Sequence, residues 1–579
     1  MLMEFTVVLT LLVFGVNIYL HKPIVESFLF SVALAVGLTP QMLPAIISVT
    51  LVKGARKMAE AKVIVKRLEA IEDFGGMNVL CSDKTGTLTQ GTMKVSGAVD
   101  RQGKPSDEVV RLAQINAIGV RASRTRSTRR LPPPRLRASW TRTTCSARFP
   151  GLLPPPPKRA GEGRGGRQAH LQGAVEAVLG ACQDGDGIRE HFERLSNEGL
   201  RVLAVSVRQF TEVPTLTPDL EQGMELAGLV AFEDPLREDS AATVEELRRK
   251  GVRLKLITGD NRHVACHVAR QVGLNADNVV TGDAMGSLTS AALTKQVQKT
   301  DVFAEVDPVQ KERLILALKK AGYAVGYIGD GINDGPALHA ADVGLSVSSA
   351  VDVAKEAADF VMLERGLAVI VAGVEEGRRI FANTLKYIFI NTSASFGNVL
   401  SMAAASVFLP FLPLLPKQIL LNNFLTDFPV LTIANDEVDA EILAKPRFWN
   451  VKSVRTFMFI FGIHSSVFDL LSFGALIFLL RASETQFHTS WFIESAVSEL
   501  AILLVIRTRK TFFRSLPGKA LLIASAGATL AVCLLPVTRS FGLVPLPPMY
   551  ALVIAAILVL YVGTADLLKR WYAGGKYPL

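Results

Sequence analysis

Cysteine is scarce in this chain of 579 residues, and its placement excludes two classes of protein. The five cysteines are scattered, with neither the close spacing of a metal site nor the density of a disulfide framework. They are Cys81, Cys145, Cys182, Cys266 and Cys533. A disulfide-stapled scaffold and a cysteine-ligated metal site are therefore excluded.

The sequence also lacks a complete dinucleotide-binding motif, a signal peptide and evidence for a nucleic-acid partner. The run that begins Gly329-Asp330-Gly331 lacks the third glycine of a dinucleotide fingerprint and does not predict a dinucleotide site. No small-residue cleavage site follows the apolar N-terminal segment, so we interpret that segment as a membrane span and not as a signal peptide. The net charge of +10 comes largely from one atypical segment, residues 120–171. No nucleic-acid partner is therefore expected.

Long apolar runs are what the sequence does have. Hydrophobic residues make up 49% of the chain and the mean hydropathy is +0.32, both high for a soluble protein. The run lengths suit membrane helices of roughly 20 residues. The runs cover residues 5–20, 27–52, most of 385–435, 456–480, 491–506, 519–537 and 549–568. Counting two spans in the longest run, we expect about eight spans in a lipid bilayer.

Basic residues indicate how these spans are oriented. Lys53, Arg56 and Lys57 follow the second run, and the C-terminal segment 569–576 is also basic. An even number of spans puts both ends of the chain on one side, which the positive-inside rule assigns to the cytoplasm. Residues 53–380, which have the composition of a soluble protein, are then cytoplasmic.

This cytoplasmic stretch carries polar clusters at the ends of predicted strands. The strands are Met77–Cys81, Leu254–Ile257 and Ala324–Ile328, and they lead into Asp83–Thr89, Thr258–Asn261 and Gly329–Asp334. Helices are predicted for Ser240–Lys250, Arg262–Val272 and Gln310–Ala321. Strands that alternate with helices predict a parallel sheet, whose strand ends place the three clusters in one site.

The residue types in these clusters suit chemistry on phosphate. Asp83 and Asp330, with the carbonyl of Thr85, offer hard oxygen ligands for Mg²⁺. Thr258 and the backbone near Gly259 can hold phosphate oxygens, and Lys311 can neutralise the charge of a transferring group. Taken singly, Asp334 is equally well a helix cap, Lys311 a solvated lysine and Asp260 a turn residue. Their occurrence together in this order favours a site.

The segments Asp83–Thr89, Thr258–Asn261 and Gly329–Leu338 resemble the phosphorylation-domain motifs of P-type ATPases. The resemblance implies a haloacid-dehalogenase-like α/β domain in which Asp83 accepts the γ-phosphoryl group of ATP. It implies a surrounding catalytic set of Lys84, Thr85, Thr258, Gly259, Asp260, Lys311 and Asn333. It implies Mg²⁺ as cofactor at Asp83, Thr85, Asp330 and Asp334. Asp234-Pro235 resembles the hinge that joins the family's nucleotide-binding domain to this one.

Polar residues within the apolar runs are candidates for a transported ion. Pro40 and Pro44 flank Gln41 in the second run, and paired prolines free backbone carbonyls that a cation can use, although a plain proline kink is the simpler interpretation. Gln41 lies where calcium pumps carry a glutamate. Intramembrane ionisable residues are functional candidates by default, so Asp427 is the strongest ion ligand, with Asn398 and Asn422 behind it. Asp469, Glu494 and Glu499 are interpreted as structural or interface residues.

The wider sequence resembles the magnesium-translocating branch of bacterial P-type ATPases. The similar passages are residues 35–44, 62–90, 393–401, 408–416 and 490–495, and the resemblance covers 1–115 and 173–579. It implies a divalent cation as cargo, moved inward, with amide and carboxylate groups at Asn398 and Asp427 in its site. The oxygen ligands suit Mg²⁺, and the absence of a Cys-Pro-Cys run argues against a heavy metal.

Two departures from the family pattern are predicted to matter. No Thr-Gly-Glu motif occurs, so we expect the chain to be truncated and to lack the domain that removes the phosphate. Residues 120–171 are rich in Arg and Pro and contain a single acid, Glu162, which is typical of disorder. Gln172 stands before Gly173 where the family's nucleotide site has a lysine. A pair of compensating frameshifts explains the segment, and a basic disordered insertion is the alternative.

The predicted organisation is a helical membrane bundle with an α/β phosphorylation domain and an inserted nucleotide domain. Two spans in 1–52, the family's third and fourth, precede the phosphorylation domain in 53–98 and 234–380, the nucleotide domain in 99–233 and about six spans in 381–579. The predicted function is ATP-driven transport of Mg²⁺ across the plasma membrane of a bacterium. A remnant with phosphoryl chemistry but no transport, and a pump for another cation such as Ca²⁺, remain alternatives.

Overall fold

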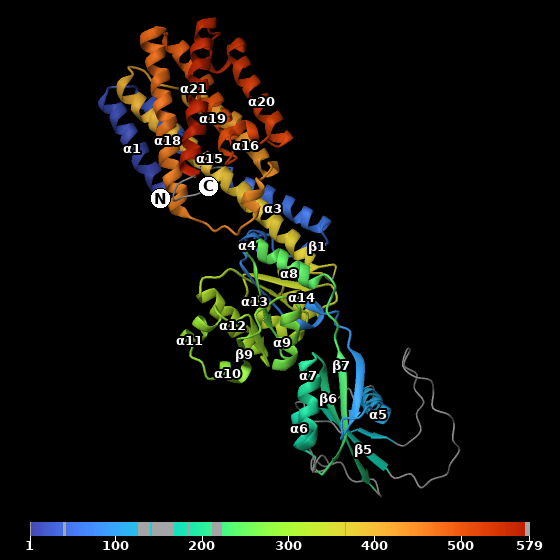
Figure 1. Ribbon diagram of the computed structural model, residues 1–579. Coiled ribbons are helices and arrows are strands. Elements are labelled where there is room, and N and C mark those ends of the chain that lie inside the picture. Colours follow the sequence, from blue (N-terminus) through green and yellow to red (C-terminus); the bar gives the residue numbers. More distant parts are fainter. Residues whose placement is uncertain are drawn as a thin grey trace.

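The chain forms an elongated molecule with a helical bundle at one end, an α/β domain in the middle and a smaller domain at the other end (Figure 1). This computed structural model describes residues 2–38, 42–124, 139–141, 167–182, 186–210, 223–364 and 366–573. In Figure 1 both ends of the chain lie at the side of the bundle that faces the α/β domain.

The middle domain is built on an eight-stranded sheet in the order β1-β13-β12-β11-β2-β8-β10-β9. All neighbouring strands are parallel except β1 and β13. The bounds are β1 Val63–Val65, β2 Val79–Ser82, β8 Arg253–Ile257, β9 Val279–Thr281, β10 Val302–Ala304, β11 Val325–Ile328, β12 Val343–Val347 and β13 Phe360–Met362. The predicted strands are thus confirmed as β2, β8 and β11, which lie side by side at the centre. Strands β2 and β11 are buried along their whole length, as parallel strands covered on both faces are.

The predicted helices of this domain are also confirmed. They are α8 (Ser240–Arg249), α9 (Arg262–Gln271) and α12 (Pro308–Lys320). Helix α12 begins in a capping box in which Asp307 accepts from the Gln310 amide while the Gln310 side chain accepts from the Asp307 amide. Pro308 follows at the first helical position, where its missing N–H leaves no bond unmade. The capped start of the helix fixes the position of Lys311, which lies in the first turn of α12.

The smaller domain has a five-stranded antiparallel sheet in the order β3-β7-β6-β5-β4. Its elements are β3 Lys94–Asp100, α5 Asp107–Arg124, β4 Ser139–Thr141, β5 Arg167–Gly173, α6 Val175–Leu179, α7 Arg189–Asn197, β6 Arg201–Phe210 and β7 Glu225–Glu233. Within the segment predicted to be disordered, 120–124, 139–141 and 167–171 lie in α5, β4 and β5, and the rest of 120–171 lies outside the described residues. The sheet begins at Lys94, five residues before the predicted start of this domain.

The bundle contains helices for each predicted span. They are α1 Leu2–Tyr19, α2 Ile24–Leu38 with α3 Leu43–Glu60, α15 Ala368–Phe408, α16 Pro416–Leu431, α18 Val451–Gly474, α19 Glu484–Ile506, α20 Lys519–Leu534 and α21 Pro548–Ala573. By length and composition alone, four helical stretches of the described chain, in α18 to α21, suffice to cross a membrane. Within the second predicted span, α2 is described as far as Leu38 and α3 begins at Leu43. Pro40 and Gln41 lie in this interval, outside the described residues.

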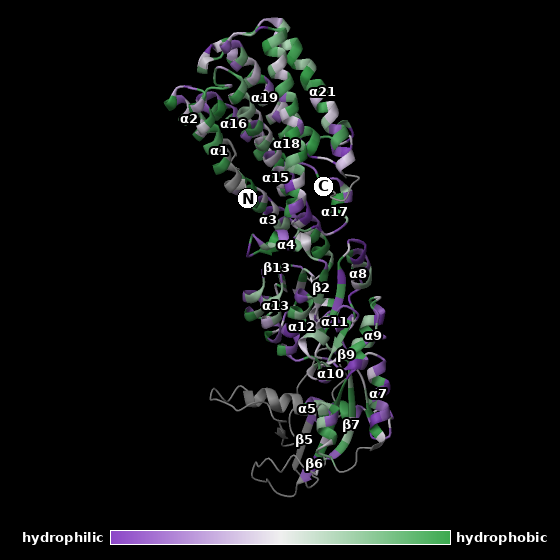
Figure 2. Ribbon diagram, turned by 90° about the vertical axis from the view of Figure 1, so that its left-hand side faces the viewer, coloured by the Kyte–Doolittle hydropathy of each residue, from purple (hydrophilic) through white to green (hydrophobic). Residues whose placement is uncertain are grey.

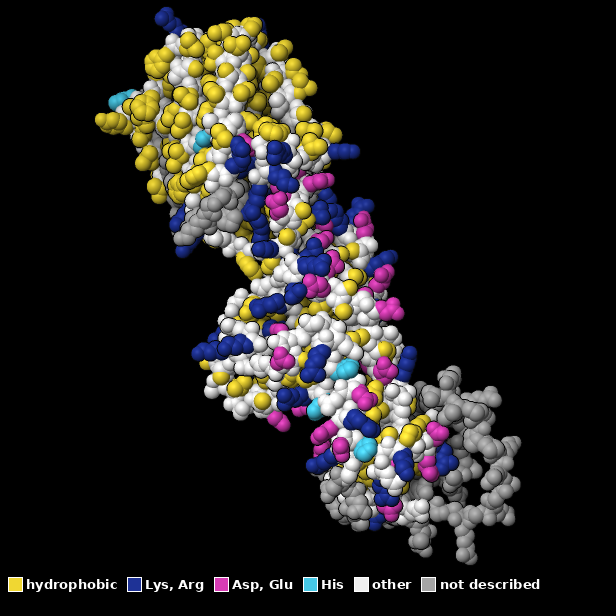
Figure 3. All heavy atoms as spheres, in the orientation of Figure 1, with side chains coloured by type: hydrophobic (Ala, Val, Ile, Leu, Met, Phe, Trp, Pro, Cys, Tyr) yellow, Lys and Arg dark blue, Asp and Glu magenta, His cyan; other side chains and the backbone are white. Residues whose placement is uncertain are grey.

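The surface marks the part of the molecule that faces lipid. On the face seen in Figure 3, apolar side chains cover most of the bundle, and basic and acidic side chains gather from its boundary with the α/β domain onward; the ribbon in Figure 2 has its longest stretches of hydrophobic colour in the bundle. Many large apolar side chains of the bundle are exposed, as a lipid-facing surface requires. The bundle is therefore the membrane domain.

Helix α15 links the two halves of the molecule. It runs unbroken for 41 residues from the α/β domain into the bundle, across the predicted domain boundary at residue 380. Its Gly377 packs so closely on Gly75 at the end of α4 (Ala70–Gly76) that a Cβ on either would overlap the other's backbone region. Next to it, the buried Arg378 guanidinium donates to the carbonyls of Gly75 (3.1 Å), Lys250 (2.8 Å) and Leu443 (2.8 Å). Because Leu443 ends the short helix α17 (Ala440–Leu443), which lies between α16 and α18, this arginine connects the α/β domain to α15 and to the segment that joins two helices of the bundle.

Candidate functional site

Asp83 lies at the carboxyl end of the central strand β2, at the start of an irregular loop. Its Oδ1 accepts a hydrogen bond of 2.6 Å from the Lys84 amide, and its side chain is 19% exposed. The loop turns back through Gly86, at φ +75°, and Thr89 closes it by donating to the Lys84 carbonyl (3.1 Å). The carboxylate is thus held in place at the sheet edge while one side remains open to a substrate.

A lysine from α12 joins Asp83 to a second carboxylate. Lys311 Nζ lies 2.6 Å from Asp83 Oδ2 and 2.8 Å from Asp334 Oδ1, and its side chain is only 4% exposed. Asp334 also accepts from the Tyr327 hydroxyl (2.6 Å) and the Gly331 amide (3.0 Å). Asp334 therefore accepts hydrogen bonds from three groups of the protein, and its part in holding Mg²⁺ stays a prediction.

The protonation equilibria follow from this arrangement. Burial raises the pKa of the Asp83 carboxyl, and Asp334 adds to the effect, while Lys311 opposes it. Burial alone would lower the pKa of Lys311, but the Asp83 and Asp334 carboxylates outweigh it and raise that pKa. The lysine consequently stays protonated and supplies a fixed positive charge next to the acceptor oxygen.

The second predicted cluster, Thr258–Asn261, lies beside the first. Thr258, at the end of β8, is buried and accepts from the Asp260 amide (3.2 Å), and Asp260 Oδ2 forms an ion pair of 2.5 Å with Lys84 Nζ. Gly259 is exposed, as is Asn333 in the loop after β11. The structure thus brings Lys84, Thr258 and Asp260 together near Asp83, and leaves Gly259 and Asn333 at the open side.

The geometry around Gly86 fits a magnesium ion. A Cβ at Gly86 would overlap Asp330 Oδ2, so only glycine lets the Asp330 carboxylate approach the loop that carries Asp83 and Thr85. Within the described part of the chain no three His, Cys, Asp or Glu side chains converge as a ready-made metal site. Asp83, Asp330 and the Thr85 carbonyl would therefore hold Mg²⁺ with water completing its shell, as this ion prefers.

The predicted hinge is hydrogen-bonded to the same loop. Asp234 accepts from the Thr89 hydroxyl (2.6 Å) and the Gly91 amide (2.9 Å), and the Pro235 carbonyl accepts from the Gln90 amide (2.9 Å). These bonds join the two chain segments that lead into β3 and out of β7. In the smaller domain itself, Gln172 and Gly173 lie at the end of β5, opposite Val205 and Ala204 of β6. Their part in nucleotide binding stays a prediction.

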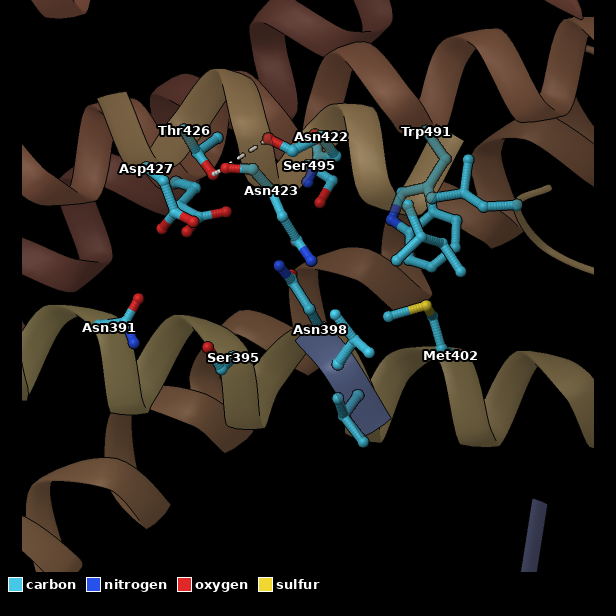
Figure 4. A pocket seen from close by; sticks show the side chains of 15 residues that line it. Asn391, Ser395, Asn398, Met402, Asn422, Asn423, Thr426, Asp427, Trp491 and Ser495 are labelled. Carbon is cyan, nitrogen blue, oxygen red and sulfur yellow. Dashed lines mark hydrogen bonds between the residues drawn. The ribbon is translucent and has the colours of Figure 1, made fainter. Parts of the chain in front are cut away.

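The predicted ion ligands meet in a pocket inside the bundle (Figure 4). Asn398 comes from α15, and Asn422 and Asp427 come from α16. Figure 4 shows Asn398 and Asn423 reaching toward each other across this pocket, with Asp427 further along α16. The structure therefore brings together the described part of the predicted ion site, from the two consecutive helices α15 and α16.

One acidic residue of the pocket was interpreted differently from sequence. Glu499 on α19 lines the pocket and interacts with the Thr426 hydroxyl and the Asn398 amide. Asp469 and Glu494, by contrast, contact each other, and Asp469 accepts from Ser401 (2.6 Å) and from the Trp491 indole (2.9 Å). The sequence could have distinguished Glu499 from Glu494 only by the side of α19 on which each residue lies. The hydrophobic residues of α19 are not gathered on one side of the helix, so they do not reveal this difference.

Comparisons with known proteins agree with this geometry. Residues 77–342 match the model of haloacid dehalogenase-like hydrolases, and residues 411–571 match that of the cation transporting ATPase C-terminus. The magnesium-transporting ATPase, P-type 1, of Salmonella typhimurium is 36% identical over 99% of this chain and 67% of its own length. The chain belongs to the P-type ATPase family.

Other P-type ATPases are similar at comparable or greater distance. The magnesium-transporting ATPase, P-type 1, of Escherichia coli K12 is also 36% identical, over 99% of this chain and 67% of its own length. The calcium-transporting ATPase 1 of Bacillus cereus is 28% identical over 83% of this chain and 58% of its own length. The chain thus spans about two thirds of the length of these two magnesium-transporting ATPases.

Proposed function

We propose that this chain couples ATP to the transport of Mg²⁺ through an aspartyl phosphate at Asp83. The single observation that carries the proposal is the contact of Lys311 with Asp83 at the strand end, because it presents an acceptor oxygen beside a fixed cation. The relatives named as magnesium-transporting support Mg²⁺ as cargo. The soluble domains then lie in the cytoplasm and the bundle in the plasma membrane of a bacterium.

Each residue of the site has its own part in the proposed phosphoryl transfer. An Asp83 oxygen attacks the γ-phosphorus of ATP, a new O–P bond forms, and the bond to the β-phosphate oxygen breaks so that ADP leaves. Lys311 offsets the negative charge on the phosphoryl group, and Thr258 with the backbone beside it holds its oxygens. Mg²⁺, when bound, neutralises further charge on the phosphates. Asp334 and Tyr327 keep Lys311 aimed at the acceptor.

Phosphate labelling tests this proposal. The full chain in membranes is incubated with γ-³²P-labelled ATP and Mg²⁺, quenched in acid, and assayed for label and, in parallel vesicles, for Mg²⁺ uptake. We expect acid-stable label in the wild type, none in Asp83→Asn, and normal label in the control Asp283→Asn, whose side chain is exposed on another loop. Absence of label in the wild type would overturn the proposal.

The same assay separates the alternatives. Label that depends on Asp83 without uptake of any cation would identify a chain with phosphoryl chemistry but no transport. Uptake of Ca²⁺ in preference to Mg²⁺ would identify a different cargo. Uptake of Mg²⁺ that is lost in Asp83→Asn supports the proposal in full.

A further inference from the structure

Two buried acids contact each other inside the membrane bundle. Asp469 lies on α18 and Glu494 on α19, their carboxyl groups are within hydrogen-bond reach, and both residues are at most 3% exposed. Neither is among the described residues that line the cation pocket, and neither has a basic partner among its described contacts. Two ionised carboxylates in contact repel each other strongly when no cation lies between them. The contact therefore requires a proton, which belongs to the pair.

The surrounding donors indicate where this proton lies. One oxygen of Asp469 accepts from the Ser401 hydroxyl of α15 (2.6 Å), and the other accepts from the Trp491 indole of α19 (2.9 Å). Oε2 of Glu494, by contrast, has no hydrogen-bond partner among the described atoms. Asp469 is thus the better stabilised anion, so Glu494 carries the proton and donates it to Asp469.

Two further polar groups at the same helix interface are unsatisfied. Ser472 follows Asp469 by three residues, and Ser490 precedes Glu494 by four, so each serine lies on the same helix face as its acid. Both hydroxyls are buried and have no hydrogen-bond partner among the described atoms. They lie on the side of the pair away from the α/β domain, because α18 starts from the segment that Arg378 contacts. Hydroxyls without partners can bind water or pass a proton, so the pair belongs to a larger polar patch.

The pair is joined to the wall of the cation pocket. Trp491, which donates to Asp469, lines that pocket at the end opposite Asp427 (Figure 4). Ser401, the other donor, follows the predicted ligand Asn398 by three residues on α15. Loss of the shared proton would leave two negative charges in contact and force the carboxyl groups apart. The position of Trp491 therefore depends on the protonation of the pair.

Few other titratable groups lie near the two acids. Tyr561 of α21 is close enough to interact electrostatically with both of them. Away from the helix ends, the other titratable side chains of the packed helices contact other groups or the surface, and they are Tyr387, Asp427, His464, His488, Glu499 and Cys533. A response to pH that disappears with Glu494 is therefore separable from the titration of these groups.

We propose that Asp469 and Glu494 form a proton-binding site between α18 and α19, and that the bound proton holds Trp491 in the wall of the cation pocket. The effect on transport rests on the proposed function, whereas the proton site itself does not. The proton is present at low pH and is lost as the pH rises. Uptake of Mg²⁺ is then lost at alkaline pH, because the repelled carboxylates no longer hold Trp491 in place.

Infrared spectroscopy detects the proton directly. The full chain in vesicles is measured in H₂O and in D₂O, and the C=O stretching band of protonated carboxylic acids is followed as the pH is raised. In Glu494→Gln we expect this band to lose the share of one acid, because the Gln amide donates to Asp469 without a titratable proton. The matched control, Glu484→Gln, removes an exposed carboxylate from the start of the same helix and should leave the band unchanged.

Uptake of Mg²⁺ by the same vesicles tests the link to the pocket. In the wild type we expect uptake to fall over the pH range in which the Glu494-dependent band disappears, by up to about tenfold per pH unit. In Glu494→Gln the contact with Asp469 does not depend on pH, so this decline should be absent. In Glu484→Gln the decline should match that of the wild type.

Each outcome has a separate meaning. The same band in the wild type and in Glu494→Gln would overturn the proton site, whatever the result for transport. An alkaline decline that persists in Glu494→Gln would overturn the link to the pocket. A wild type that takes up no Mg²⁺ contradicts the proposed function, and the infrared result still decides the proton site. Should Glu494→Gln fail to fold, as judged by loss of Asp83 labelling, the double variant Asp469→Asn with Glu494→Gln replaces it, and an unchanged band there would overturn the proton site.

Discussion

The phosphorylation domain and the membrane bundle both bury pairs of carboxylates, and they differ in the source of the opposing charge. In the first, Lys311 lies between Asp83 and Asp334, within 2.8 Å of both. In the second, Asp427 and Glu499 line a pocket that has no basic residue among its described lining. Under the proposed function, the protein supplies a cation at the site that would hold an anionic phosphoryl group, and the described lining supplies none at the pocket where the cargo would bring its own charge.

The largest effect should come from removing the built-in cation. Lys311→Ala leaves Asp83 and Asp334 without the positive charge that lies between them, which destabilises by about 3–5 kcal/mol, and it removes the charge opposite the phosphoryl group. We expect phosphorylation of Asp83 to slow by at least about 100-fold. Lys319→Ala, on the same helix, breaks a partly exposed ion pair with Asp342 (2.9 Å) and should label normally. Equal labelling of Lys311→Ala and Lys319→Ala would contradict the contrast drawn above between the phosphorylation site and the membrane pocket.

A second test concerns the magnesium ion that would complete the phosphorylation site. Gly86→Ala forces a side chain into a left-handed backbone position, unfavourable by about 1–2 kcal/mol, and into the space of Asp330. We expect the Mg²⁺ concentration for half-maximal labelling to rise about tenfold. Gly273→Ala imposes the same strain at φ +78° with no neighbour within 4 Å. It should lower the melting temperature without changing the Mg²⁺ dependence, and a shift in both variants would mean that strain alone is responsible.

A third substitution weakens the contact between the α/β domain and the membrane bundle. Arg378→Gln removes donors to three carbonyls, each worth about 0.5–1.5 kcal/mol, from the contact between the α/β domain and the bundle. We expect Asp83 to be labelled but the Mg²⁺ transported per phosphate released to fall severalfold. Arg379→Gln, which removes only the partner of Glu376 (3.2 Å), should keep the wild-type ratio. An unchanged ratio in Arg378→Gln would show that coupling does not depend on this contact.

The smallest expected effect concerns the reactivity of a cysteine in the buried centre of the sheet that carries Asp83. Cys81 is fully buried in β2, and burial raises the pKa of its thiol to about 12. Thiolate is the reactive form, so N-ethylmaleimide should leave Cys81 unmodified in the folded chain and modify it after denaturation. Peptide mass spectrometry distinguishes it from the partly exposed Cys266, which serves as the internal control. Rapid modification of Cys81 in the native protein would show that the centre of the sheet opens.

Much of the phosphorylation domain could be predicted because its signals are local. Strand β2 is an apolar run that ends in a polar turn, and the capping residues of α12 precede Lys311 directly. The two outermost strands on each side of the sheet, β1 and β13 on one side and β10 and β9 on the other, have only three residues each, too few for a period to show. These short strands form only by pairing with neighbouring strands of the sheet, so the local sequence does not reveal them.

The membrane pocket was only partly predictable because helix packing decides which residues line it. Asp427 and Asn398 were found from their polarity within apolar runs. Glu499 has the same polarity as Glu494 and lies five residues from it, yet one lines the pocket and the other does not. That difference arises from the rotation of α19 against α15 and α16, which no local pattern in α19 records.

The unbroken helix α15 has a mechanical consequence. Arg378 clamps it to the α/β domain, and Asn398 lies 20 residues further along the same helix, about 30 Å away at 1.5 Å per residue. A tilt of about 5° around the clamp would carry Asn398 through between 2 and 3 Å by this geometry. A Mg²⁺–oxygen distance is only about 2.1 Å, so a swing of this size is enough to dismantle a coordination shell. Helix α15 therefore has the geometry of a lever, because a small rotation at Arg378 becomes a displacement at Asn398 that is comparable to a Mg²⁺–oxygen distance.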